Sequence, residues 1–209
     1  EDHGGAIAYH TPFESAVPTK EGFAVTAGGT TVTCRNLINS AGLSAQAMAE
    51  RISGLPPEHI PTRYLTKGSY FTMTTRSPFS HLIYPVPNTA SLGIHVTIDL
   101  AGQIRFGPDQ EWVDHIDYEV DPSRCRDFYE AIRRYYPALP DDSLIPAYSG
   151  IRPKVQTPEE AMADFMILDE RDHDVAGLVN LFGMESPGLT SSLRIGEAVK
   201  DKLSETGRL

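Results

Sequence analysis

Hydrophobic and polar residues alternate over short stretches of the first forty positions, a pattern typical of β-strands. Glycine pairs and polar residues separate these stretches and indicate turns, for example at Gly28-Gly29. The pattern predicts strands at Ala6 to His10, Gly22 to Thr26, Thr31 to Cys34 and Leu37 to Asn39. The period then lengthens to that of a helix, which Ser44 can cap and which runs through Ile52 to a stop at Gly54.

The middle of the chain shows further alternating stretches between Lys67 and Asp99. They predict an antiparallel meander with strands at Ser69 to Thr74, Leu82 to Val86 and Leu92 to Ile98, and turns at Ser77-Pro78 and Pro87-Asn88. A helix follows, with Asp121 as its cap and Pro122 at its first position. Its apolar stripe is formed by Phe128, Ile132 and Tyr135, and it stops at Pro137.

The last sixty residues return to strands and end in a helix. Strands are predicted at Ser149 to Lys154, Asp164 to Leu168 and Leu178 to Phe182. The final helix is predicted to begin at Ser186-Pro187, with an apolar side made of Leu189, Leu193, Ala198, Val199 and Leu203. We therefore expect an α+β fold in which residues 1–43 and 147–209 form an α/β remnant of one domain. Residues 44–146 would be a second, inserted domain with a mostly antiparallel sheet.

Charge limits the kind of partner. The 18 basic and 28 acidic residues give a formal net charge of -10, with no basic cluster of useful size. Nucleic-acid binding is therefore not expected. An anionic substrate would have to be held by a few placed cations, because the overall field opposes its approach.

Two cysteines, Cys34 and Cys125, lie in dissimilar contexts and predict neither a disulfide framework nor a metal site. A reducing compartment such as the cytoplasm fits this usage. No apolar run approaches the roughly 18 residues of a membrane span, and the start of the chain lacks the pattern of a signal peptide. A peripheral contact with the inner membrane is left open.

One strand carries a single histidine on a polar face. Alternation from Leu92 to Ile98 puts the apolar residues on one side, and Gly93, His95 and Thr97 on the other. This pattern fits a sheet that lines a pocket, where a neutral imidazole can accept a proton. A structural histidine that only completes hydrogen bonds is the alternative.

The segment from Gly177 to Ser192 reads as a buried strand, a glycine turn and the start of a helix. The unpaired N–H groups and the positive dipole end of a helix suit an anion or an electron-rich ring edge. An ordinary capped helix start explains the same residues on physical grounds.

Three segments, taken in order, resemble the D-amino-acid oxidase superfamily of FAD enzymes. They are Leu37-Ile-Asn-Ser-Ala-Gly42, Gly150-Ile-Arg-Pro153, and the glycine turn from Gly183. Four further segments resemble the L-2-hydroxyglutarate oxidase/dehydrogenase branch of that superfamily: Tyr64 to Phe71, Leu82 to Pro87, Leu92 to His95 and Phe106 to Asp109. The matches run from about Thr11 to Val199, which is nearly the whole chain.

The resemblance implies a partial, Rossmann-type FAD-binding domain in the two terminal segments and a substrate domain between them. It also implies positions that contact FAD, namely Ala41, Gly42, Gly183, Ser186, Pro187, Gly188, Leu189 and Thr190. The last helix would stabilise negative charge on the reduced ring. For Gly42, a simple turn glycine is the alternative.

The arginine of G-x-R-P forks onto the substrate carboxylate in the resembling oxidases, which assigns that role to Arg152. Lys154 lies two residues further on the same strand face and is a candidate for a second carboxylate. Lys67, Tyr70 and Tyr84 are candidate pocket residues from their motifs. The alternatives are a surface salt bridge for Arg152, a solvated lysine for Lys154, and simple strand packing for the tyrosines.

The resemblance therefore predicts FAD-dependent oxidation of an L-2-hydroxy acid, with His95 as base and oxygen or a quinone as electron acceptor. Oxidation of glycine, sarcosine or a D-amino acid is the nearest alternative, and a catalytically silent binding module is another. The G-x-G-x-x-G loop that holds the FAD pyrophosphate is missing from the sequence. We expect the chain to be a carboxyl-terminal fragment that by itself binds FAD poorly.

Overall fold

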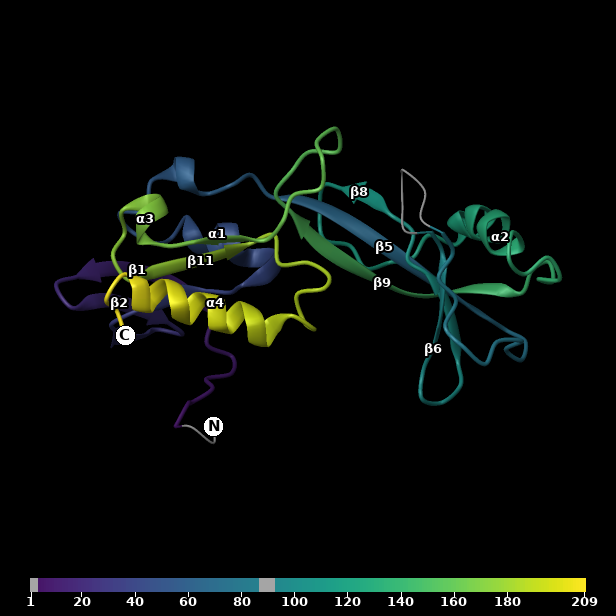
Figure 1. Cartoon of the computed structure of the whole chain (residues 1–209), viewed down its shortest axis with the longest axis horizontal. Coiled ribbons are helices and arrows are strands. Elements are labelled where there is room, and N and C mark those ends of the chain that lie inside the picture. Colours follow the sequence, from purple (N-terminus) through teal and green to yellow (C-terminus); the bar gives the residue numbers. More distant parts are fainter. Residues whose placement is uncertain (1–3, 87–92) are drawn as a thin grey trace. The chain divides into compact units, whose positions relative to one another are not determined.

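Apolar residues from two separate stretches of the chain form the core of a first unit, which comprises Glu1–Arg63 and Pro153–Leu209. A second unit comprises Tyr64–Arg152 and has its own core. The computed structural model describes residues 4–86 and 93–209, and Figure 1 labels several elements of each unit. The predicted boundaries after residues 43 and 146 differ from these. Ala45 and Ala49 lie in the core of the first unit, so the first helix belongs there.

The first unit begins with an antiparallel sheet of three strands, β1 (Phe13–Thr19), β2 (Gly22–Ala27) and β3 (Thr30–Cys34). The predictions for β2 and β3 are confirmed, and the Gly28-Gly29 turn joins them. The predicted strand at Ala6 to His10 is wrong, because that stretch is irregular and β2 pairs with β1 instead. β1 was not predicted, since Pro18 and the polar residues around it weaken its alternation.

The second sheet of this unit contains β10 (Met166–Leu168), β11 (Leu178–Phe182) and β4 (Leu37–Asn39), in that order. β11 runs parallel to β4 and antiparallel to β10. Alternate residues of β11 enter different cores: Leu178 and Phe182 pack with α1 (Ala45–Ala49), whereas Val179 and Leu181 pack with α4 (Ser192–Glu205). The short helix α3 (Glu170–His173) lies between β10 and β11 in the chain.

Two helices of the first unit differ from their predicted ranges. α1 ends at Ala49 rather than near Ile52, because the next residues pair with β1 through the Ala16↔Ile52 bridge. α4 begins at Ser192, six residues after the predicted start at Ser186. The intervening residues form a turn in which the hydroxyls of Thr190 and Ser191 donate to the carbonyl of Pro187. Side-chain bonds of this kind compete with helical hydrogen bonding.

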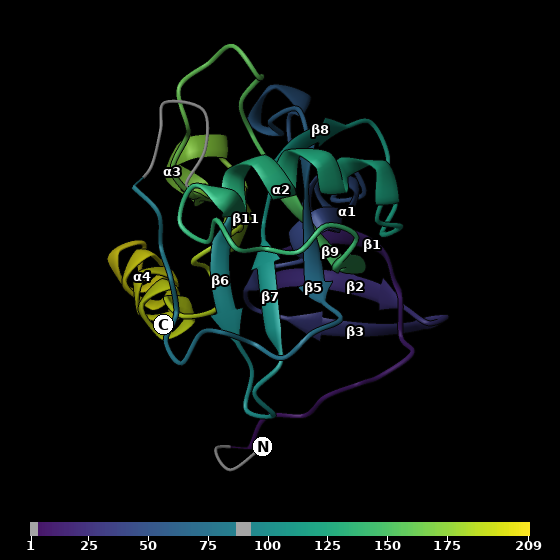
Figure 2. The same ribbon diagram turned by 90° about the vertical axis from the view of Figure 1, so that its right-hand side faces the viewer.

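The second unit is built on a largely antiparallel sheet. Its strands are β5 (Tyr64–Met73), β6 (His95–Ile98), β7 (Ile104–Gly107), β8 (Glu111–Val113) and β9 (Leu144–Lys154), the last of which runs on into the first unit. The order is β6-β7-β5-β8, and β9 also pairs with β5. Helix α2 (Cys125–Arg133) crosses one face of this sheet (Figure 2) and buries Phe128 and Ile132 there.

The helix predicted after Asp121 is confirmed, with the Asp121 carboxylate accepting from the amide of Ser123 at its start. The meander is confirmed in part. β5 is longer than predicted, and Leu82 to Val86 contributes only the bridge between Ile83 and Val96. Leu92 and the predicted Pro87-Asn88 turn lie outside the described residues. The expected α+β class with mostly antiparallel sheets is confirmed.

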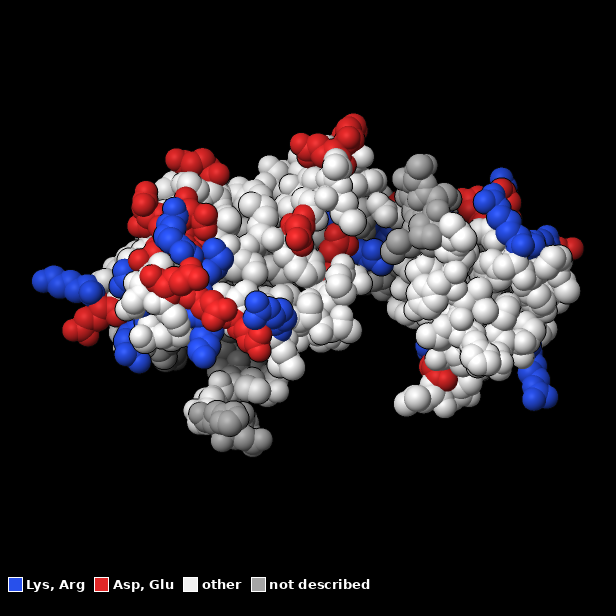
Figure 3. Space-filling view, in the orientation of Figure 1, with Lys and Arg blue, Asp and Glu red and all other residues white. Residues whose placement is uncertain are grey.

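Charged side chains of both signs intermingle over the face of the first unit that carries α4 (Figure 3). In this unit Asp169, the N-cap of α3, is buried, with 2% of its surface exposed. Its carboxylate accepts from the Arg171 guanidinium and from Lys202 of α4. These charges therefore fix α3 against α4. In neither described stretch of the chain is a helix long and apolar enough to cross a membrane.

Candidate functional site

The sheet of the second unit has one apolar face and one polar face. Val96, Ile104 and Phe106 are buried in the core beneath α2. Because neighbouring residues of a strand point to opposite sides, His95 and Arg105 lie on the other face. The polar face predicted for the strand of His95 is therefore present, and the apolar residues behind it belong to the core.

A glycine on β7 makes room for an aromatic ring on this face. The register of β5, β7 and β6 aligns Tyr70, Gly107 and His95 across the three strands. A Cβ on Gly107 would lie 2.7 Å from the Tyr70 ring and 2.7 Å from the carbonyl oxygen of Ser69. Its φ of +141° also disfavours any other residue. Gly107 thus allows the Tyr70 ring to pack directly against its backbone.

Tyr148 of β9 stacks on Tyr70, with ring centroids 4.5 Å apart and an interplanar angle of 11°. The Arg105 guanidinium lies 5.6 Å from the centroid of the Tyr148 ring. Burial and the neighbouring Tyr148 raise the pKa of Tyr70, while the positive charge of Arg152 acts in the opposite direction. Tyr70 is therefore a neutral hydrogen-bond donor at neutral pH, close to the arginine predicted to bind a carboxylate.

The predicted base and one predicted pocket tyrosine are neighbours. The Tyr84 and His95 rings have centroids 4.4 Å apart and are tilted by 46°. Tyr84 also interacts electrostatically with Tyr70. His95, Tyr84, Tyr70 and Arg152, selected from four separate motifs, therefore form one cluster in the second unit.

The two predicted lysines are held by acidic groups. The Lys67 ammonium donates to Asp117 at 3.1 Å and to the carbonyl oxygen of Glu119, and only 7% of the residue is exposed. Lys154 is 5% exposed and forms a buried ion pair with Glu185 in the first unit. A substrate role for either lysine stays a prediction, and Lys154 is not the solvated surface lysine of the alternative.

The Ala41-Gly42 turn of the first unit is positioned by a buried amide. Asn39 is fully buried, and its carboxamide donates to the carbonyl of Ala45 at 2.8 Å and to Asn180 at 2.9 Å. Its oxygen accepts from the amide of Ala41 at 3.3 Å. Gly42 has a φ of +57°, and a Cβ there would meet no atom within 4 Å. The turn therefore presents bare backbone to open space.

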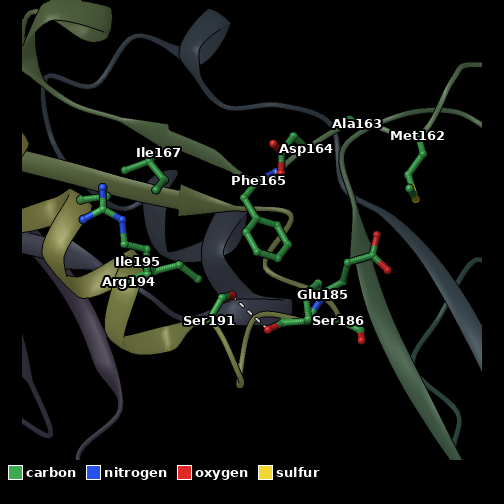
Figure 4. A pocket seen from close by; sticks show the side chains of 12 residues that line it. Met162, Ala163, Asp164, Phe165, Ile167, Glu185, Ser186, Ser191, Arg194 and Ile195 are labelled. Carbon is green, nitrogen blue, oxygen red and sulfur yellow. Dashed lines mark hydrogen bonds between the residues drawn. The ribbon is translucent and has the colours of Figure 1, made fainter.

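The second predicted turn, from Gly183 to Thr190, leads into α4. A Cβ on Gly188 would lie 2.7 Å from the carbonyl oxygen of Glu185, so the turn requires a glycine there. The Ser191 hydroxyl bonds back to Pro187, as the dashed line in Figure 4 shows, and α4 has no side-chain cap. The amide of Ser192 donates to the carbonyl of Leu189 at 3.3 Å, and no side chain of the N-cap residue accepts from the other amides of this turn. Leu189 is 89% exposed rather than on a buried stripe.

Hollows lie on both sides of this turn. One, of about 410 Å³, is seen in Figure 4 between the Phe165 segment and the start of α4. The other, of about 440 Å³, lies between α4 and the ends of β4 and β11. It is lined by residues that include Ser40, Gly188 and Leu189. The ends of two parallel strands and an uncapped helix start therefore surround a mainly apolar hollow with a polar edge.

Sequence reasoning did not single out Tyr148, Arg105 or Asn39. Tyr148 lies four residues before Arg152, so extending the predicted strand by one residue would have placed both on one face. Asn39 ends a short strand of otherwise apolar residues. A polar side chain at such a position needs hydrogen-bond partners, and this requirement could have identified it. No cluster of histidine, cysteine or acidic side chains suited to a metal ion occurs within residues 4–86 and 93–209.

Comparison with known proteins gives a consistent result. The family model described as "FAD dependent oxidoreductase" (DAO) matches residues 1–202. The mitochondrial L-2-hydroxyglutarate dehydrogenase of Arabidopsis thaliana is 49% identical over 178 residues, which cover 79% of this chain and 37% of that protein.

Solved structures share the fold. The FAD-bound L-α-glycerophosphate oxidase of Mycoplasma pneumoniae has a TM-score of 0.72 at 20% identity, with 93% of this chain and 50% of that chain covered. The glycine oxidase of Bacillus cereus has a TM-score of 0.68 at 16% identity, with 97% and 52% covered. The chain thus spans about half the length of these structures and less of the plant relative.

Proposed function

Because this chain belongs to the FAD-dependent oxidoreductase family, we propose that the protein oxidises an L-2-hydroxy acid to the 2-oxo acid. L-2-hydroxyglutarate is the proposed substrate, and the 49% identical plant dehydrogenase that bears this name supports the choice. The observation that carries the proposal is the cluster of His95, Tyr84, Tyr70 and Arg152 on one sheet face. It combines a candidate base, tyrosine hydroxyls and a forked cation.

The first unit fits the flavin that the family uses. The open space beside Gly42 and the hollow along Gly188 allow a flat group to approach the backbone without meeting a side chain. The uncapped start of α4 offers amide donors and the positive end of its dipole to an anionic ring edge. Ala41, Gly183, Ser186, Pro187, Leu189 and Thr190 complete the proposed contact set. When bound, FAD supplies the two-electron acceptor.

The second unit would hold and deprotonate the substrate. The Arg152 guanidinium binds the α-carboxylate through paired N–H donors, which fixes the orientation of the α-carbon. The His95 imidazole accepts the proton of the α-hydroxyl as the carbonyl forms. Tyr84 packs against the imidazole and limits its rotation. Tyr70 stays protonated at neutral pH and stacks on Tyr148, so that both tyrosines border the substrate site.

The proposal extends to the acceptor and the compartment. The two cysteines are free, which supports a reducing compartment such as the cytoplasm, with peripheral contact to the inner membrane as an option. Electrons would pass from the reduced flavin to oxygen or a quinone.

Anaerobic mixing of the full-length, flavin-loaded protein with L-2-hydroxyglutarate, and separately with glycine, tests the function. Bleaching of the flavin absorbance by the hydroxy acid alone is the expected result. Bleaching by glycine alone would replace the proposal with amine oxidation. If neither compound bleaches the flavin, the chain belongs to a binding module without this activity.

A further inference from the structure

Gly150 leaves a notch in the polar face of the second unit. Tyr148, Gly150 and Arg152 are alternate residues of β9, so their side-chain positions lie on the same side of the strand. A Cβ built on Gly150 would meet no atom within 4 Å, and its φ lies outside the left-handed region. Nothing in the backbone or its surroundings therefore requires a glycine at this position, in contrast to Gly107.

The two ends of the notch differ in chemistry. Arg152 supplies a guanidinium at one end. At the other end stands Tyr148, which is 46% exposed and is held between the Tyr70 ring and the Arg105 guanidinium. Arg105 forms an ion pair with Asp99 at 3.0 Å, which keeps the cation on this side of the sheet. An anionic oxygen can therefore bind the Arg152 guanidinium at one end and accept a hydrogen bond from the Tyr148 hydroxyl at the other.

The spacing suits a substrate with an acidic group at each end. Four residues of strand separate the Cα atoms of Tyr148 and Arg152 by about 13 Å. Because both side chains stand roughly perpendicular to the strand, the gap between them is similar, and a hydrogen bond of about 2.8 Å at each end takes up about 6 Å of it. The remaining space accommodates a carbon chain of a few atoms lying over Gly150.

We infer that Gly150 is the floor of the substrate site and that Tyr148 binds the far carboxylate of a dicarboxylic hydroxy acid. This inference rests on the proposed function and deepens it. It assigns to Tyr148, beside Arg105, the role that the sequence pattern had suggested for Lys154, whose ammonium is paired with Glu185. Selection for a diacid then depends on a phenol and on the absence of a side chain between it and Arg152.

Steady-state kinetics of the full-length protein with two five-carbon substrates provide the test. L-2-hydroxyglutarate carries the far carboxylate, and L-2-hydroxypentanoate ends in a methyl group. For Tyr148→Phe we expect KM for the diacid to rise about 10-fold, because one hydrogen bond to a charged group is lost. KM for the monoacid, which has no far carboxylate, should rise much less than KM for the diacid.

Gly150→Val separates a substrate role from a structural one. Valine suits a strand and meets no atom here, so the melting temperature should be unchanged or higher. KM for the diacid should nevertheless rise by about 10-fold or more as the side chain fills the notch. Gly5→Val, at another glycine with open space, and Tyr118→Phe, at another exposed tyrosine, are the matched controls and should change neither value.

The outcomes are distinct. A wild-type KM in Gly150→Val, or equal losses for both acids in Tyr148→Phe, would overturn the inference while leaving hydroxy-acid oxidation intact. Equal use of the two acids by the wild type would also overturn it. A wild-type protein that oxidises neither acid would refute the proposed function itself.

Discussion

The buried ion pair between Lys154 and Glu185 allows a structural role of Lys154 to be distinguished from a role in substrate binding. The lysine side chain is 6% exposed and the glutamate side chain 10%, so the pair is screened little by solvent. Removing one partner of a buried pair costs about 3–5 kcal/mol of folding free energy. Because Glu185 makes a further interaction, we expect Lys154→Met to lose about 3 kcal/mol, the lower end of that range.

Urea denaturation of the chain, followed by circular dichroism, measures this loss. With an m-value of about 2 kcal/mol per molar urea, the midpoint should fall by about 1.5 M. The Lys154→Met/Glu185→Gln double variant should be more stable than the sum of the single effects predicts, by about 2 kcal/mol. Lys200→Met, at an exposed lysine, serves as the control and should stay within about 0.5 kcal/mol of the wild type.

One result would refute the reasoning. If Lys154→Met left the urea midpoint within about 0.3 M of the wild type and instead raised KM for the substrate, Lys154 would be a substrate ligand. The ion pair with Glu185 would then not be the main role of Lys154. Lys154 would instead bind a second substrate carboxylate, as the strand pattern predicts.

Three further predictions concern stability. Arg171 and Lys202 hold the pKa of Asp169 well below its usual range, so this carboxylate stabilises the fold above its unfolded pKa, about 3.9, and less as pH falls. Asp169→Asn should thus lower the free energy of unfolding by about 2–3 kcal/mol at pH 7 and by much less near pH 2. Urea titrations of both proteins at the two pH values measure this difference. An equal loss at both pH values would show that the ionised carboxylate is not the cause. Asn39→Ala should cost about 2–3 kcal/mol and speed amide exchange in the turn it holds, whereas unchanged exchange would contradict the positioning role. Gly107→Ala should lower stability by about 2 kcal/mol or more in thermal unfolding, and a neutral effect would show that the Tyr70 ring is not confined.

Local patterns in the sequence predicted those elements whose cause is local. The strand from Leu178 to Phe182 was predicted because a mainly apolar run lies between two glycines there. In the structure every residue of this strand, β11, is buried. The helix after Asp121 was found from its cap and from the stripe formed by Phe128 and Ile132. In these segments, propensity, capping and burial favour the same structure.

Elements and roles that depend on distant partners were missed. The start of α4 was placed too early, since the pattern of Leu189 and Leu193 is helical although both are more than 80% exposed. The motif of Lys67 predicted a pocket residue, which stays a prediction, but it did not reveal the ion pair with Asp117, 50 residues away. Tyr148 escaped notice because its partner Tyr70 comes from a distant strand. Composition and periodicity carry no information on such pairs.

Gly107 and Gly150, the two glycines described on the polar face, differ in whether the fold tolerates a side chain at their positions. Gly107 is closed to change, since a single methyl group already collides with backbone. Gly150 is open to change, because the fold accepts a side chain there. Substitutions at Gly150, from alanine to larger residues, could therefore favour progressively shorter substrates, and each variant would still fold. In protein engineering, this position is the natural place to begin when a different hydroxy acid is wanted.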